Sequence, residues 1–144
     1  MRFWDASALV ALVVEDIFSE QASRWNRDDP EIAAWCLSPA EIWSAVARKR
    51  RDGKLNSPEV RNAREKLSQL MTVWNEVTDI VAVRQRSFRL LDLYRLRSGD
   101  ALQLGAALVA VGDHPDGAEL VTTDARLAEA AEIEGFRVIG VEPV

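Results

Sequence analysis

The stretch Arg2-Phe3-Trp4-Asp5-Ala6-Ser7-Ala8-Leu9-Val10 decides the fold of this chain of 144 residues. Its first three residues favour a β-strand, and after Asp5 the apolar run Ala6–Val14 favours a helix. In an α/β sheet, ligands usually bind at the carboxyl ends of the strands. The stretch therefore predicts an α/β protein and makes Asp5 a candidate site residue.

The rest of the chain continues the alternation of strands and helices. Further strands are expected at Ile32–Leu37, Ile80–Val83, Leu120–Thr122 and Arg137–Val141. Further helices are expected at Ile17–Asn26, Ser38–Asp52, Ser57–Trp74, Arg84–Tyr94, Asp100–Val111 and Ala125–Glu134. Such alternation favours right-handed crossovers. We predict a single domain over residues 1–144, with a three-layer α/β/α fold and a central, mainly parallel sheet.

The composition excludes several classes of protein and of site. One cysteine, Cys36, and one histidine, His114, leave no disulfide framework, no multi-cysteine zinc site and no histidine cluster. The longest run without a charge, Ala101–Gly112, is well short of the roughly 20 apolar residues that span a bilayer. We expect a soluble cytoplasmic protein without a membrane partner, whose chemistry comes from carboxylates, arginines and hydroxyls.

Motifs of other enzyme classes are missing from the sequence. The chain contains no G-x-x-x-x-G-K-[ST], no G-x-G-x-x-G and no G-x-S-x-G. His114 lies in a turn-like stretch and is expected to be a solvated loop residue. An aspartyl-phosphate site at Asp5 is disfavoured, because all three lysines lie in the middle of the chain and none comes late enough to balance a phosphoryl group.

Four carboxylates stand at the starts of predicted helices. They are Asp5, Glu41, Asp100 and Asp124. Each alone could be a helix cap or a first-turn acid, and Ser38 with Glu41 has the pattern of a capping box. Together, at one edge of the sheet, they would repel one another unless a divalent cation, Mg²⁺ or Mn²⁺, neutralised them. Such an ion can activate water for attack on a phosphodiester.

Four segments of the chain, in order, resemble the acidic motifs of the PIN domain. They are Phe3–Val10, Ser38–Ala45, Ser98–Leu108 and Leu120–Leu127. The ordered set covers essentially the whole chain and is far more specific than any one segment. The chain length and the helical middle look most like the VapC ribonuclease toxins of type II toxin–antitoxin modules.

The resemblance implies an endoribonuclease that depends on Mg²⁺ or Mn²⁺, hydrolyses RNA phosphodiester bonds, is usually a homodimer and is inhibited by a cognate antitoxin. By this resemblance Asp5 and Asp100 are metal ligands, and Glu41 and Asp124 complete the catalytic site. Two hydroxyl residues, Ser7 and Thr122, match supporting positions of the motifs.

Three features depart from the family pattern. Gln103 stands where many relatives have histidine, Gly105 where alanine is common, and the loop Gly112–Gly117 is long. Since no departure touches a carboxylate, the resemblance still favours an enzyme. The alternative is a subunit with the nuclease fold that binds RNA or a protein partner without turnover.

The positive charge of the chain is concentrated in its middle. Residues 42–99 hold 13 of the 18 lysines and arginines. The basic side chains that we predict to contact RNA are Arg48, Arg95, Arg97 and Arg126. Solvated helix faces and cations that favour a helix C-terminus are the structural alternative.

The apolar residues predict packing and self-association. The five tryptophans are expected to pack in the core or at an interface rather than to stack on bases. The run Ser57–Trp74 offers more apolar surface than one small sheet needs, which favours a homodimer.

Overall fold

The computed structural model describes residues 1–141, in which strands alternate with one or two helices. The strands are β1 (Arg2–Trp4), β2 (Ile32–Trp35), β3 (Asn75–Val77), β4 (Glu119–Thr122) and β5 (Arg137–Gly140). The helices are α1 (Ala6–Val13), α2 (Ser19–Asp28), α3 (Ser38–Arg51), α4 (Ser57–Val73), α5 (Ile80–Leu93), α6 (Ser98–Ala110) and α7 (Ala125–Glu134).

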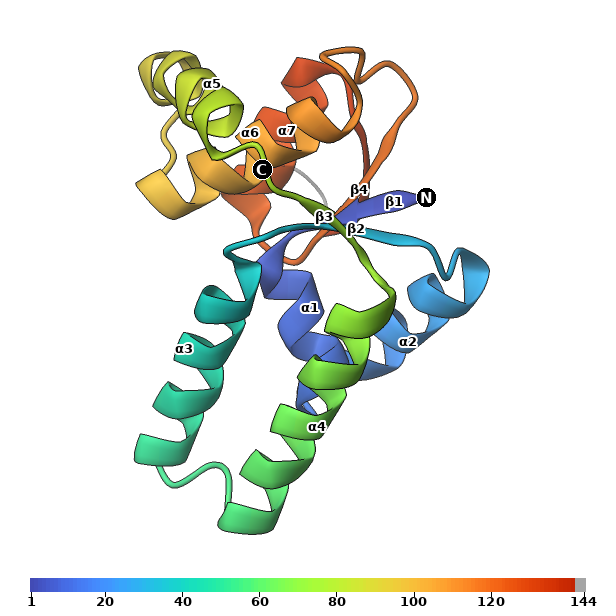
Figure 1. The fold of residues 1–144 in the computed structure, drawn as a ribbon, viewed down its shortest axis with the longest axis vertical. Coiled ribbons are helices and arrows are strands. Elements are labelled where there is room, and N and C mark those ends of the chain that lie inside the picture. Colours follow the sequence, from blue (N-terminus) through green and yellow to red (C-terminus); the bar gives the residue numbers. More distant parts are fainter. Residues whose placement is uncertain (142–144) are drawn as a thin grey trace.

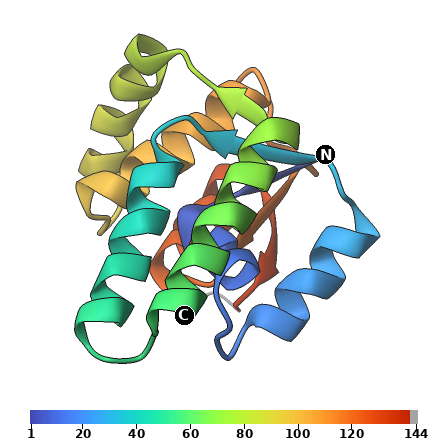
Figure 2. The same ribbon diagram turned by 60° about the horizontal axis from the view of Figure 1, so that its bottom comes forward.

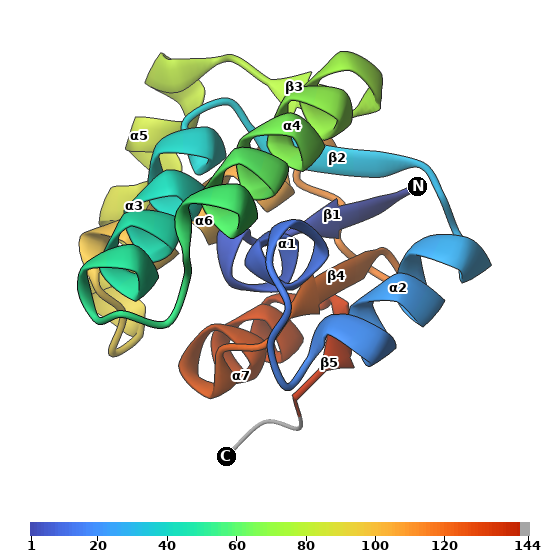
Figure 3. The same ribbon diagram turned by 90° about the horizontal axis from the view of Figure 1, so that it is seen from below.

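The five described strands form one sheet in the order β3-β2-β1-β4-β5, and every pairing is parallel. The chain first winds outward from β1 to β2 and β3, then crosses back to add β4 and β5 on the other side of β1 (Figure 3). The strand order therefore reverses between β1 and β4. The crevice outside the carboxyl ends of two such strands is where open α/β sheets bind ligands.

Helices cover both faces of the sheet. Helices α1 to α4 lie on one face and α5 to α7 on the other (Figure 1). Each face has its own core: Trp4, Leu9 and Ile42 are buried on the first, and Trp35, Leu104 and Leu120 on the second. The predicted three-layer α/β/α fold is confirmed, and the sheet is parallel throughout the described residues.

Helices α3 and α4 form a hairpin that projects beyond the body of the domain (Figures 1 and 2). A capping box starts α4, because Asn56 and Glu59 each bond the other's backbone N–H. Midway along the pair, the Arg64 guanidinium lies 4.7 Å from the ring centre of Trp43. All five tryptophans are buried or pack against the core, as predicted.

One predicted strand is wrong. The β-branched stretch Ile80–Val83 is the first turn of α5, because Asp79 Oδ1 accepts from the Ala82 N–H and caps the helix. The third strand is instead the short edge strand β3, at Asn75–Val77, which pairs with β2. Local β propensity was overridden by the cap and by the packing of α5 on α6.

Other element boundaries differ from prediction by a few residues. The strand predicted to reach Leu37 ends at Trp35, and the predicted last strand ends at Gly140. In residues 1–141, no helix has both the length and the apolar character needed to cross a bilayer.

Candidate active site

The reversal of strand order brings two aspartates together. Asp5 directly follows β1, and Asp124 lies two residues beyond β4, each at the start of a helix. Helix α3 brings Glu41 and helix α6 brings Asp100 to the same edge of the sheet. Burial raises the pKa values of Asp5, Glu41 and Asp100, and the carboxylates are near enough for repulsion between them to add to the rise.

Asp5 is a buried carboxylate that does not cap its helix. Its side chain is 3% exposed and makes no capping hydrogen bond to α1. Instead, Ser7 Oγ and Thr122 Oγ1 both donate to Asp5 Oδ2, the latter at 2.8 Å. Burial raises the pKa of Asp5 to about 6; the two hydroxyls act in the opposite direction, and Asp100 and Asp124 add to the rise.

The two hydroxyls join the ends of β1 and β4. Ser7 Oγ accepts from the Thr123 N–H at 3.1 Å, and Thr122 Oγ1 accepts from the Asp124 N–H at 3.0 Å. Beside Thr122 in the sheet lies Gly140, with φ +128°. A Cβ there would come within 1.9 Å of the Thr122 carbonyl oxygen, so only glycine fits.

Asp124 is a helix cap, unlike Asp5. Its Oδ1 accepts from the backbone N–H groups of Arg126 and Leu127 at 2.9 and 3.1 Å. The interpretation that an aspartate at a helix start is a helix cap therefore holds for Asp124 and fails for Asp5. Since Oδ1 makes both capping bonds, Oδ2 is the oxygen that Asp124 can turn toward the site.

Glu41 and Asp100 come from helices that approach closely. A Cβ on Gly99 would lie 3.6 Å from Glu41 Oε1, so the carboxyl end of Glu41 packs against α6. This burial raises the pKa of Glu41 to about 7, a hydrogen bond from Gln103 lowers it, and Asp5 and Asp100 raise it further. Burial is also the first cause of the raised pKa of Asp100, followed by repulsion from Asp124.

The predicted capping box at Ser38 is wrong. Helix α3 begins at Ser38 itself, its N-cap is Leu37, and no side chain caps it. The Ser38 hydroxyl instead accepts from Gln103 Nε2 at 2.9 Å, across from α6. Neither partner was predicted as a site residue, although an amide inside the apolar run Ala101–Val111 is a signal that a buried polar contact exists.

The donor set fits a hard divalent cation. All four candidates are carboxylates, and among the described residues both side-chain hydrogen bonds to Asp5 end on Oδ2, leaving Oδ1 for another ligand. Within residues 1–141, however, no three such side chains are placed to enclose one ion directly. Mg²⁺ usually keeps several waters and is held in proteins by one or two carboxylates.

Two of the four predicted RNA-binding arginines lie at the site. Arg97 and Arg126 line a polar pocket of about 440 Å³ together with Asp100, Asp124 and Ala125. Arg95 is exposed outside this pocket. Arg48 lies seven residues from Glu41 on α3, about 10 Å along the helix axis.

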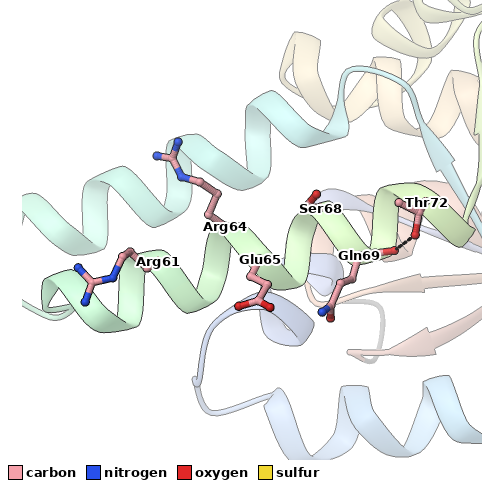
Figure 4. A pocket seen from close by; sticks show the side chains of 6 residues that line it. All are labelled: Arg61, Arg64, Glu65, Ser68, Gln69 and Thr72. Atoms are coloured by element: carbon pink, nitrogen blue, oxygen red, sulfur yellow. Dashed lines mark hydrogen bonds between the residues drawn. The ribbon is translucent and has the colours of Figure 1, made fainter.

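A larger depression, of about 510 Å³, runs along α4 and contains no predicted site residue. Its lining residues are Arg61, Arg64, Glu65, Ser68, Gln69 and Thr72. Figure 4 shows that these side chains all come from one helix, with Arg64 and Ser68 on one side and Glu65 and Gln69 on the other. Because they do not converge, the depression is a surface groove without the features of a catalytic site.

The family model of the PIN domain matches residues 2–133 of the chain. The chain belongs to the PIN domain family. No curated protein matches this PIN domain significantly. The predicted resemblance is thus confirmed at the level of the family.

Solved structures share the fold of this PIN domain at low sequence identity. FitAcB from Neisseria gonorrhoeae matches with a TM-score of 0.66 and 15% identity, covering 95% of this chain and 97% of that one. VapC20 of Mycobacterium tuberculosis, a toxin that cleaves the sarcin–ricin loop, matches with a TM-score of 0.63 and 19% identity, covering 90% and 95%. A toxin–antitoxin complex from Klebsiella pneumoniae matches with a TM-score of 0.58 and 18% identity, covering 88% of each chain.

Proposed function

We propose that this PIN domain is an endoribonuclease that depends on Mg²⁺ or Mn²⁺ and acts as the toxin of a toxin–antitoxin pair. The observation that carries the proposal is Asp5, a buried carboxylate with a raised pKa that makes no capping hydrogen bond and is repelled by Asp100 and Asp124. A carboxylate buried among other acids destabilises the fold, so a functional role explains its presence better than a structural one. The fold shared with VapC20 and with a toxin–antitoxin complex supports the RNA substrate and the antitoxin partner.

The residues divide into three groups by role. Asp5 and Asp100 would hold the ion directly, and Glu41 and Asp124 would complete the site through water. When bound, the cation supplies charge neutralisation and lowers the pKa of a bound water for attack on the phosphodiester. Ser7 and Thr122 fix the orientation of Asp5, because both hydroxyls donate to the same oxygen.

Arginines would hold the RNA. Arg97 and Arg126 share a pocket with Asp100 and Asp124, so they can bind a phosphate beside the acids. Arg95 lies two residues before Arg97 and would hold the next phosphate of the strand. Arg48, at the far end of α3, could only contact RNA well away from the bond that is cut.

Self-association is proposed through α5 rather than α4. On α4, Val60 and Leu67 are buried in the core, and the exposed apolar residues Met71 and Val73 are two apart and so lie on different sides of the helix. On α5, by contrast, Val81, Phe88 and Leu91 are exposed at a spacing that places them on one helix face. A homodimer in solution would be detected by sedimentation at micromolar concentration, and a monomer would contradict this part of the proposal.

The alternative is a subunit with the nuclease fold that binds RNA or a protein partner without turnover. Incubation with total RNA and Mg²⁺ discriminates the two. We expect cleavage by the wild type and none by Asp5→Asn or in the presence of EDTA. Equal cleavage by Asp5→Asn would point to a contaminating nuclease, and RNA binding without cleavage by the wild type would establish the alternative.

A further inference from the structure

A buried pair of polar side chains joins the two helices that carry Glu41 and Asp100. Ser38 on α3 and Gln103 on α6 each have 0% of their surface exposed, and Gln103 Nε2 donates to Ser38 Oγ at 2.9 Å. The other buried serines, Ser19 and Ser87, donate to backbone carbonyls three or five residues away. The Ser38–Gln103 pair instead spans 65 residues of chain, so it connects elements rather than finishing a turn.

Each residue of the Ser38–Gln103 pair lies one helical turn from one of the acids. Ser38 precedes Glu41 by three residues on α3, and Gln103 follows Asp100 by three residues on α6. Residues three apart share a helix face, so the faces that meet through the pair are the faces that carry the two acids. Gly99 permits this close approach, since a Cβ there would already touch Glu41.

The Gln103 amide contacts both partners on α3. One of its two N–H groups donates to Ser38 Oγ, and the amide lies near enough to the Glu41 carboxylate to lower its pKa. The Gln103 carbonyl oxygen lies 3.4 Å from Ser38 Oγ, so the hydroxyl can complete the pair. A neutral amide is well suited to this place, because a lysine would neutralise Glu41 and compete with a cation for it.

We propose that Gln103, held by Ser38, is a positioning residue that fixes the Glu41 carboxylate at a set distance from Asp100. The inference rests on the proposed metal-dependent nuclease activity. Four mutually repelling acids tend to move apart when no cation is bound. A buried amide on the helix of Asp100, bonded to the helix of Glu41 three residues from that acid, opposes that movement and prepares the site for the ion. Partners that orient metal ligands in this way typically contribute 10- to 100-fold to affinity or activity.

The test compares Gln103→Leu, which removes both N–H groups at similar volume, with Gln103→His, which keeps a donor. The matched control is Ser87→Ala, a buried serine on α5 whose hydroxyl, within residues 1–141, bonds only the Arg84 carbonyl. Three quantities are measured for each: the Mn²⁺ dissociation constant by calorimetry, kcat and KM for RNA at saturating Mn²⁺, and the melting temperature.

We expect Gln103→Leu to weaken Mn²⁺ binding and to lower kcat, each by about 10- to 100-fold, with KM for RNA unchanged. Gln103→His should recover most of the loss, and Ser87→Ala should lower only the melting temperature. Ser38→Ala should reproduce part of the loss alone and add little to Gln103→Leu, because the two residues act as one unit.

The outcomes separate this inference from the proposed function. If Gln103→Leu binds Mn²⁺ and turns over RNA like the wild type, whatever its melting temperature, the pair is structural only and the inference is wrong. If the wild type binds Mn²⁺ but cuts no RNA, the proposed function fails, and the Mn²⁺ affinity of the variants still decides the inference. A wild type that binds no Mn²⁺ at millimolar concentration overturns both.

Discussion

The β1–α1 and β4–α7 junctions have the same plan, yet their aspartates are used differently. In each, a short strand leads to an aspartate at the start of a helix. Asp124 accepts two backbone N–H groups and caps α7, whereas Asp5 caps nothing and receives two hydroxyls on one oxygen. The difference teaches that an aspartate at a helix start has no fixed role, and that its hydrogen-bond partners and its burial decide between a cap and a reactive group.

The largest difference between the junctions is expected in catalysis. Asp5→Asn removes a buried charge that no other group replaces, and we expect RNA cleavage to fall by more than about a hundredfold. Asp124→Asn keeps the cap, since asparagine is an equally good N-cap, and should lower RNA cleavage less, by about tenfold. Cleavage rates at saturating Mg²⁺ measure both. Equal losses would mean that the two aspartates do the same work and that the contrast between them is only structural.

The second difference concerns stability against pH in the absence of metal. The folded-state pKa values of Asp5 and Glu41, about 6 and 7, lie above those of an unfolded chain, so the folded state binds protons more tightly. The free energy of unfolding should therefore rise as the pH falls from about 7 to about 4, with a contribution from Asp5 of up to about 3 kcal/mol. Urea unfolding in EDTA at several pH values measures this.

The same titration distinguishes the variants. Asp5→Asn should remove the part of the dependence that Asp5 contributes, because its amide cannot titrate, and leave the part from Glu41, while Asp124→Asn should leave most of both. A wild type whose stability does not change between pH 5 and pH 8 would show that the Asp5 carboxyl is not destabilised by its surroundings.

A third prediction tests whether the gathered acids respond to a cation. Wild type should gain melting temperature in millimolar Mn²⁺, and Asp100→Asn should gain much less. Without metal, Asp100→Asn should be as stable as the wild type or more so, because one repulsion has been removed. Asp92→Asn, an exposed aspartate on α5, is the matched control. A response of Asp100→Asn equal to that of the wild type would exclude Asp100 as a ligand.

A fourth prediction separates the arginines beside the junctions from those farther away. In an Asp5→Asn background, replacing Arg95 and Arg97 with Gln should weaken RNA binding and flatten its salt dependence. The expected change is about one to two units of slope, at about 0.7 per phosphate contact. Arg48→Gln should have a smaller effect, since Arg48 lies at the other end of α3. The reverse order would place the RNA along the α3–α4 hairpin instead.

The smallest effect is on the cap itself. Asp124→Ala should lower the free energy of unfolding by about 1 kcal/mol, because two backbone N–H groups of α7 lose their acceptor. Asp124→Asn, which still accepts the capping hydrogen bonds, should lose little of this stability. Thermal or urea unfolding at pH 7 with Mg²⁺ absent compares the two, and an unchanged stability of Asp124→Ala would contradict the capping role.

Much of this architecture could be predicted from the sequence, because hydrophobic periodicity and acids at strand ends are local signals. The failures have a common cause. Ile80–Val83 has strand character but is helical because Asp79 caps it and α6 packs on it. Ser38 has the local pattern of a cap, yet its hydroxyl bonds a residue 65 positions away. Contacts between distant elements, including the one between Gln103 and α3, leave no periodic trace.

The steric limit at Gly140 makes the nuclease site vulnerable from a distance. Any side chain there would collide with the Thr122 carbonyl, and Thr122 is the residue whose hydroxyl holds Asp5. Under the function proposed above, a cell under selection to escape the toxin could inactivate it by substituting this one residue, without changing an acid or an arginine. In a pool of survivors, substitutions of Gly140 should be recovered alongside those of the four carboxylates.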